Sequence, residues 1–393
     1  MPLAASGSRG LPVLIPARHD GVVTIWLEKF STQGDGPRLA VKDSIDVAGS
    51  RTTAACPVVG DQAAPADRDA SVVAAARAQG ARIVGKTNLT ELCRAADGVN
   101  PWTGTPENPL DAGRVPGGSS SGSAVAVALG EADVALGTDT GGSVRVPAAC
   151  CGIAGLKTTH GRVSLDGVFP FAPTLDTVGP LGRDVAALAL GMALIEPGFT
   201  PGSFDSGTAI GRLRPVGTEV APEIDAAVDA ALDAAGLTWT DEPADYWAVS
   251  LDAGNALILG EGYREHRSML AYPDRISDRI RRRIERGERI TDGMLDEAYA
   301  ARAALRDCLG KLFERYSLLA LPTITQQPPR IGAERKVDLT ALTLPFNLSG
   351  DPALALPIPV AGAALPASLQ LVAPANEEGR LLAVGAVIEA ALR

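Results

Sequence analysis

The sequence predicts an α/β layered fold built around one mixed β-sheet. Three observations support this prediction. Short apolar runs typical of strands alternate with alanine-rich or amphipathic segments typical of helices. The 393 residues are 46% hydrophobic and 21% charged, which is enough apolar material for a large core. Neither an internal repeat nor a linker-like composition divides the chain, so one domain spanning 1–393 is the simplest organisation.

The first part of the chain supplies the earliest elements of this fold. A strand is expected at 39–41, and it ends at Lys42. An alanine-rich helix is expected at 69–79, where Gly80 supplies a C-terminal stop. The elements that follow are a strand at 81–84, a glycine- and proline-rich loop at 98–118, a helix of small residues at 122–129 and a buried strand at 133–137.

The second part predicts a helical region and then a return to the sheet. Residues 185–320 are rich in Ala, Leu and Arg, and their pattern is mostly helical. We expect a twisted mixed sheet that is covered by helices on both faces. The closing elements are strands at 319–323, 354–359 and 369–372 and a helix at 379–392.

Bulk composition excludes several classes of function. The net charge is −10, and the one arginine-rich stretch, 275–289, contains interleaved acidic residues typical of a solvated helix face, so we expect no nucleic-acid binding. Three histidines leave little for a metal site, and we expect neither a metal nor a cofactor. Five cysteines without a CxxC motif indicate a reducing, cytoplasmic location. There is no signal-peptide pattern and no 18-residue apolar run, so no membrane association is expected.

Two short motifs resemble known catalytic signatures without their structural context. Residues 80–87 match the P-loop pattern GxxxxGK[ST], but a helix precedes the first glycine and the middle residues favour a strand. Residues 118–122 match GxSxG, but the preceding segment cannot form the strand that a nucleophile elbow needs. His266, a candidate partner for such a serine, is expected on an exposed helix face. We therefore expect neither nucleotide binding nor a Ser-His-Asp triad.

Three other features combine into a plausible catalytic site. Ser143 stands where a buried strand turns into a helix, directly after Gly141 and Gly142, and adjacent glycines let backbone amides converge on one point. A second serine cluster, 119–121, opens another helix. Lys42 ends a predicted strand, and a buried lysine that is held neutral can serve as the base a serine needs. Near Ser143, Asp139 and Arg145 are expected to form a structural ion pair, and Cys150 and Cys151 to be buried small hydrophobes.

These stretches resemble the amidase signature family, whose members hydrolyse carboxamides with a Ser-cisSer-Lys triad. The resemblance is dense over a signature core at 39–184, looser over a C-terminal return to the core at 340–393, and weak in the divergent helical region 185–320. The block 137–147 looks close to indole-3-acetamide hydrolases. The matching stretches are 40–43, 85–91, 104–109, 114–123, 137–148, 176–184, 346–354 and 365–371.

The resemblance implies a role for each matching residue. Ser143 would be the nucleophile, Ser119 the bridging serine whose peptide bond with Gly118 is cis, and Lys42 the base. It also implies a small-molecule amide as substrate and admits a homodimer. The oxyanion hole would be formed by the backbone N–H groups of Thr140, Gly141, Gly142 and Ser143.

Two other functions remain open within the same family. One is a glutaminase subunit of the amidotransferase A type, which acts with partner chains. The other is an allophanate-hydrolase-like enzyme, which the stretch 52–57 resembles. The residues that line the substrate pocket fall in the divergent region and carry no transferable role. Trp102 and Tyr263 could be pocket walls, but core packing is the expected use of each.

Overall fold

A computed structural model describes residues 24–205, 207–333 and 337–393; residues 1–23, 206 and 334–336 lie outside that description. Within the described residues an 11-stranded sheet runs in the order β1-β3-β2-β4-β6-β5-β10-β11-β9-β7-β8. Its pairs are both parallel and antiparallel, so the expected mixed α/β sheet is confirmed. The strands are β1 (Trp26–Lys29), β2 (Arg38–Lys42), β3 (Arg82–Thr87), β4 (Val134–Asp139), β5 (Ala154–Lys157), β6 (Thr177–Gly182), β7 (Ala209–Pro215), β8 (Thr238–Ala244), β9 (Leu318–Pro322), β10 (Ala353–Ile358) and β11 (Ala367–Val372).

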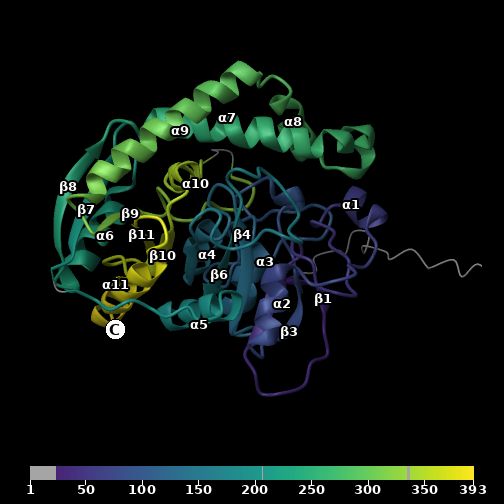
Figure 1. The fold of residues 1–393 in the computed structure, drawn as a ribbon, viewed down its shortest axis with the longest axis horizontal. Helices are drawn as coiled ribbons and strands as arrows, with labels where there is room; N and C mark the ends of the chain where they lie inside the picture. The colour runs from purple at the N-terminus through teal and green to yellow at the C-terminus, as the bar shows by residue number, and fades with distance from the viewer. Residues whose placement is uncertain (1–23, 206, 334–336) are drawn as a thin grey trace, which may run out of the picture.

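Helices cover the sheet and form a further layer above it (Figure 1). Several lie within one or two residues of the expected bounds, as α2, α3 and α11 do. The helices are α1 (Pro57–Gln62), α2 (Ser71–Ala78), η1 (Glu91–Cys93), α3 (Ser121–Ala128), α4 (Arg145–Cys151), α5 (Val185–Ile195), α6 (Pro222–Ala234), α7 (Trp247–His266), η2 (Arg267–Ala271), η3 (Pro273–Arg275), α8 (Asp278–Gly287), α9 (Asp292–Phe313), α10 (Leu344–Ser349) and α11 (Glu378–Ala391).

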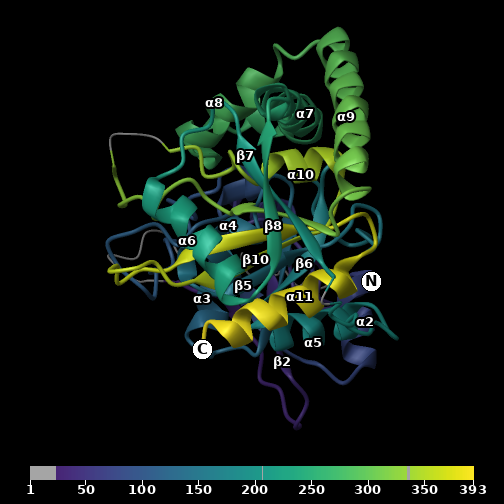
Figure 2. The ribbon, with the colours of Figure 1, turned by 90° about the vertical axis from the view of Figure 1, so that its left-hand side faces the viewer.

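Successive side chains of the central strands point to opposite faces of the sheet, and a separate apolar layer forms on each face. In β2, Leu39 and Val41 pack into the core shared with α2, α5, α6 and α11. Ala40, between them, faces the opposite way and packs with α3 and α4. Because successive strand residues point to opposite faces, one strand contributes to both layers. The expectation of helices on both faces is confirmed, and Figure 2 shows α11 and α5 along one side of the strands.

The region 185–320 is mostly helical, as expected, but it also contains two strands that the sequence did not predict. It contributes strands β7 and β8, which pair in parallel with each other, and β7 also pairs in parallel with β9. The helix α6 connects β7 to β8, as a parallel crossover requires. Buried and exposed residues do not alternate regularly along β7 and β8. The sequence therefore lacks the pattern that would predict a strand there. Helices α7, α8 and α9 of this region form the helical layer at the top of Figure 1.

The P-loop-like motif at 80–87 has a structural explanation. Gly80 follows α2 with φ +83°, and the next residues form β3, where Lys86 makes a buried ion pair of 2.9 Å with Asp43. This segment is therefore a core strand and not a phosphate-binding loop. The expectation that His266 lies on an exposed helix face is wrong, because the residue is 1% exposed and its ring stacks on Phe169 and Phe171. Among helices of the described residues, none has both the length and the apolarity needed to cross a bilayer.

Candidate active site

Lys42 and Ser119 meet in the interior of the protein. Lys42 is the last residue of β2, and Ser119 lies just before α3, which packs on β2 and β4. Lys42 Nζ lies 2.7 Å from Ser119 Oγ, and both residues are fully buried. The peptide bond between Gly118 and Ser119 is cis. Glycine is required at 118, because a Cβ there would lie 2.6 Å from the Thr90 hydroxyl oxygen.

Burial lowers the pKa of Lys42 below its usual 10.5. Transfer of an ammonium group out of water disfavours its charged form, so the neutral amine is favoured. Cys93, Asp139 and Asp176 act in the opposite direction, but burial is the larger effect. The amine at this position is therefore suited to accept a proton from the neighbouring hydroxyl.

Ser143 stands in the turn between β4 and α4, as the sequence predicts. Its side chain retains some exposure, with 9% of the residue accessible. The Ser143 carbonyl accepts a hydrogen bond of 3.2 Å from the N–H of Ser120, which places this turn beside the start of α3. No hydrogen bond joins Ser143 Oγ to another of the described residues. The sequence-predicted serines and lysine are thus neighbours, with the Lys42–Ser119 contact already formed.

Asp139 organises the turn that carries Ser143. Its carboxylate accepts hydrogen bonds from the N–H groups of Gly142 at 2.7 Å and Val144 at 3.1 Å. Gly142 has φ +133°, and a side chain there would clash with Thr343. A residue with a Cβ could therefore not follow this path without displacing the turn. The turn is fixed by a buried charge on one side and by the absence of a side chain on the other.

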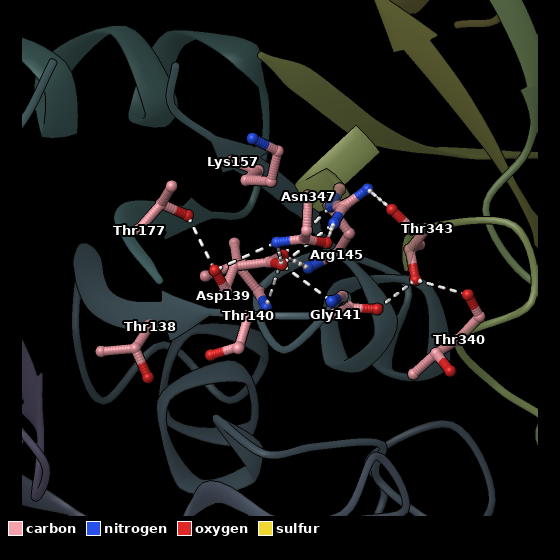
Figure 3. A network of polar contacts seen from close by, with 12 residues as sticks. Thr138, Asp139, Thr140, Gly141, Arg145, Lys157, Thr177, Thr340, Thr343 and Asn347 are labelled. Atoms are coloured by element: carbon pink, nitrogen blue, oxygen red, sulfur yellow. Dashed lines mark hydrogen bonds and ion pairs between the residues drawn. The ribbon is translucent and has the colours of Figure 1, made fainter. Parts of the chain in front are cut away.

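The predicted ion pair between Asp139 and Arg145 is confirmed, and both residues are fully buried with a separation of 2.9 Å (Figure 3). Burial alone would raise the pKa of Asp139, but Arg145 and a hydrogen bond from Asn347 hold that pKa well below its ordinary value. Arg145 also donates to the Thr343 carbonyl at 2.9 Å and to Gln370 Oε1 at 2.7 Å. The turn that carries Ser143 is thereby connected to α10 and β11 in the C-terminal part of the chain.

Replacement of Arg145 by methionine is expected to lower the free energy of unfolding by about 3–5 kcal/mol, because it leaves the Asp139 carboxylate buried without its partner. Urea denaturation followed by circular dichroism measures the change. Arg281→Met is the matched control, since Arg281 on α8 pairs with the exposed Asp278 and a surface pair contributes about 1 kcal/mol or less. Equal effects of the two substitutions would show that Arg145 does not hold the turn.

Three of the four expected oxyanion-hole amides are available for a ligand. The N–H groups of Thr140, Gly141 and Ser143 have no acceptor among the described residues, whereas the N–H of Gly142 donates to Asp139. The Thr140 hydroxyl donates to Asp176 Oδ1 at 2.5 Å, which holds the first residue of the turn. Unpaired amides in a nearly buried turn can stabilise an oxygen that develops negative charge.

The sequence did not reveal the side chains that surround Gly141. A Cβ at 141 would lie 3.2 Å from Ile258 Cδ1 on α7 and 3.6 Å from Leu344 Cδ1 on α10. Ile258 also packs against the apolar cluster that contains Cys93 and Phe171. Their placement depends on how α7 docks, and no local motif marks them. The environment of the turn that carries Ser143 is therefore apolar on this side.

The two aromatic residues considered as pocket walls have structural contacts instead. Trp102 Nε1 donates to Glu91 Oε1 at 2.9 Å. Tyr263 packs with Ile280 and Ile284 of α8. Within the described ranges, no group of three or more His, Cys, Asp or Glu side chains is arranged to hold a metal ion.

Comparison with known proteins places this geometry in a family. Residues 36–382 match the family described as Amidase. The chain is 34% identical to the A-type subunit of the glutamyl-tRNA(Gln) amidotransferase of Symbiobacterium thermophilum, over 89% of this chain and 81% of the relative. It is 35% identical to a putative amidase of Mycobacterium bovis, over 91% of this chain and 82% of the relative. A crystal structure described as an amidase superposes with a TM-score of 0.83 at 32% identity, covering 91% of this chain and 85% of the other.

The relatives refine the sequence-based expectation. They are described as amidotransferase subunits and amidases, so a particular nearness to indole-3-acetamide hydrolases is not confirmed. The match extends through the divergent region 185–320 as well as the signature core. On the combined grounds of the match over 36–382, the shared fold and the identity to these relatives, the chain belongs to the amidase signature family.

Proposed function

We propose that this amidase-family enzyme hydrolyses the C–N bond of a carboxamide through an acyl-enzyme on Ser143. Neutral Lys42 takes a proton from Ser119, which takes one from Ser143, and Ser143 Oγ attacks the carbonyl carbon. The free N–H groups of the 140–143 turn stabilise the oxyanion. Collapse of the tetrahedral intermediate breaks the C–N bond, and the Lys42–Ser119 relay returns a proton to the leaving ammonia or amine. Water then hydrolyses the acyl-enzyme and releases the carboxylic acid.

One observation carries this proposal. The contact of 2.7 Å between Lys42 Nζ and Ser119 Oγ is buried beside the Ser143 turn. Lys86, another buried lysine, pairs with the carboxylate of Asp43. Lys42 instead contacts two hydroxyls, Ser119 and Thr138. A buried amine with hydroxyl partners is the arrangement that proton transfer requires.

Ammonia release from a panel of aliphatic, aryl and amino-acid amides tests the activity. We expect release from at least one class, and we expect Ser143→Ala to slow it by about 1000-fold or more. The apolar surroundings of Gly141, Ile258 and Leu344 favour amides with an uncharged acyl group. If no amide in the panel releases ammonia faster with the wild-type chain than with Ser143→Ala, the proposed hydrolysis is wrong.

A second candidate function follows from the relatives described as the A-type chain of glutamyl-tRNA(Gln) amidotransferase. In that case the chain would release ammonia from glutamine and act together with partner chains. The purified chain alone and the chain purified with any associated subunits can be compared on glutamine and on simple amides. Glutamine hydrolysis that needs the associated subunits would favour this candidate, whereas hydrolysis of simple amides by the isolated chain would favour the first.

A further inference from the structure

The hydrogen-bond partners of Lys42 leave two possible orientations of its amine. Nζ lies 2.7 Å from Ser119 Oγ, 2.7 Å from Thr138 Oγ1 and 3.5 Å from the Thr138 carbonyl oxygen. A neutral amine has two N–H bonds and one lone pair. The carbonyl can only accept, so it takes one N–H. The second N–H and the lone pair must then be divided between the two hydroxyls.

Only one of these orientations supports catalysis. If the lone pair faces Ser119, the amine can accept the proton of that serine, and Thr138 Oγ1 accepts the second N–H. If the lone pair faces Thr138, the amine donates to Ser119 and cannot act as its base. The productive orientation therefore requires another acceptor for the Thr138 hydroxyl hydrogen.

Cys93 is placed to accept that hydrogen. Its Sγ lies 4.0 Å from Thr138 Oγ1, and a thiol sulfur is a weak acceptor. We propose that Cys93 is a positioning residue that takes the hydroxyl hydrogen of Thr138 and so keeps the lone pair of Lys42 on Ser119. The inference rests on the proposed function, because it assigns a role to the neighbours of the proposed base.

The backbone holds Cys93 in this place. Leu92 and Cys93 have φ +53° and +58°, values that are uncommon for residues with a side chain. The N–H of Leu92 donates to the Ala54 carbonyl at 3.0 Å, and the N–H of Cys93 donates to the Thr90 carbonyl at 2.9 Å. Ala54 itself has φ +49°, so two turns of unusual conformation support each other. Strained segments of this kind cluster at functional sites.

Side-chain packing also fixes the thiol. Cys93 is 5% exposed and packs with Ala55, Leu89 and Phe171. The thiol has little freedom to turn away from Thr138 in these surroundings. Substitution of serine for Cys93 would keep an acceptor in nearly the same volume, whereas alanine would remove it.

Three ionisable side chains act on the Lys42 amine, namely Cys93 from η1, Asp139 at the end of β4 and Asp176 just before β6. The two carboxylates among them are engaged elsewhere. Asp139 is paired with Arg145, and Asp176 accepts from the Thr140 hydroxyl. On the neighbouring strand β3, the buried Lys86 is paired with Asp43. Of these groups, Cys93 is the one that contacts the Thr138 hydroxyl.

The rate at which an alkyl fluorophosphonate labels Ser143 tests the inference without a known substrate. The Ser143 oxygen forms a bond to phosphorus, fluoride leaves, and the serine proton passes through Ser119 to Lys42. Cys93→Ala is expected to slow labelling by about 10-fold, the effect of losing one hydrogen bond that orients a reacting group. Cys93→Ser should label at close to the wild-type rate. Cys308→Ala, which removes a half-buried thiol on α9, should leave the rate unchanged.

The pH profile separates this role from a merely structural one. In Cys93→Ala the neutral amine gains the Thr138 hydroxyl as a donor, so the acidic limb of the labelling profile should stay in place or move to lower pH while the plateau falls. A structural disturbance that admits water would stabilise the charged amine and move the limb to higher pH. A limb at higher pH would overturn the inference.

A double-mutant comparison gives the second criterion. Thr138→Val removes the competing hydroxyl hydrogen, so Cys93→Ala should cause no further slowing in that background. If Cys93→Ala slows labelling equally in the wild-type and in the Thr138→Val background, the positioning role is overturned. Lys42→Met is the reference for the proposed function: if it labels as fast as the wild type, the proposed base is wrong, whatever Cys93 does.

Discussion

Ser143→Ala is expected to slow amide hydrolysis by about 1000-fold or more, because it removes the nucleophile while leaving the amides of the turn in place. Ammonia release at saturating and limiting amide concentrations measures the loss. Both kcat and kcat/KM should fall, since the attacking atom acts in the transition state and contributes little to substrate binding.

The exposed Ser203 provides the matched control. Ser203→Ala removes the same hydroxyl from a segment outside the helices and strands, and it should leave both constants unchanged. Equal melting temperatures of the wild type and the two variants would show that the Ser143 effect is catalytic. A Ser143→Ala enzyme within about 10-fold of the wild-type rate could not be reconciled with a Ser143 acyl-enzyme.

Lys42→Met is expected to slow hydrolysis by about 100- to 10,000-fold, the contribution of a well-placed general base. Only the neutral amine accepts a proton, so the wild-type rate should fall as pH decreases through the pKa of Lys42. Burial lowers that pKa below 10.5, which extends the active range toward neutral pH. The variant should lose this limb. Lys311→Met, which removes an exposed amine on α9, is the control.

The same substitution should increase stability. Because the pKa of Lys42 is lower in the folded chain than in the unfolded chain, the unfolded chain binds more protons. The resulting cost to folding is fully present below the folded-state pKa and disappears as pH rises above the unfolded value of about 10.4. We therefore expect Lys42→Met to raise the urea midpoint at neutral pH while lowering activity. A lower midpoint would indicate that the amine stabilises the fold.

Several elements of the candidate active site could be predicted from the sequence because local chemistry determines them. The end of β2 at Lys42, the glycine pair before Ser143 and the serines that open α3 each depend on a few adjacent residues. The ion pair between Asp139 and Arg145 is equally local. Such features are set by turn geometry and helix termini, which the sequence encodes within one or two turns of chain.

Other elements depend on partners that are distant in sequence. Strand β6 contains Pro180 and two glycines, so its intrinsic preference for a strand is low, and its pairing with β4 and β5 stabilises it. Strand β8 lies at the sheet edge with mostly polar residues, and its pairing with β7 holds it there. Tertiary context overrides local preference at these positions.

The surroundings of the candidate catalytic residues were the least predictable part. Ile258 and Leu344 reach Gly141 from α7 and α10, which are far apart in the chain. His266 looked like part of an exposed helix face, but aromatic rings from the segment before β6 cover the end of α7. Contacts of this kind arise from helix docking, which no short motif records.

The central claim is that Ser143 is the residue that becomes covalently modified. Peptide mapping by mass spectrometry after reaction with the fluorophosphonate tests this most directly. The account predicts one phosphonyl group per chain, located on Ser143, slow in Lys42→Met and absent in Ser143→Ala. A label of equal rate on Ser119, Ser120 or a cysteine in the wild type, or undiminished labelling of Ser143→Ala, would contradict it.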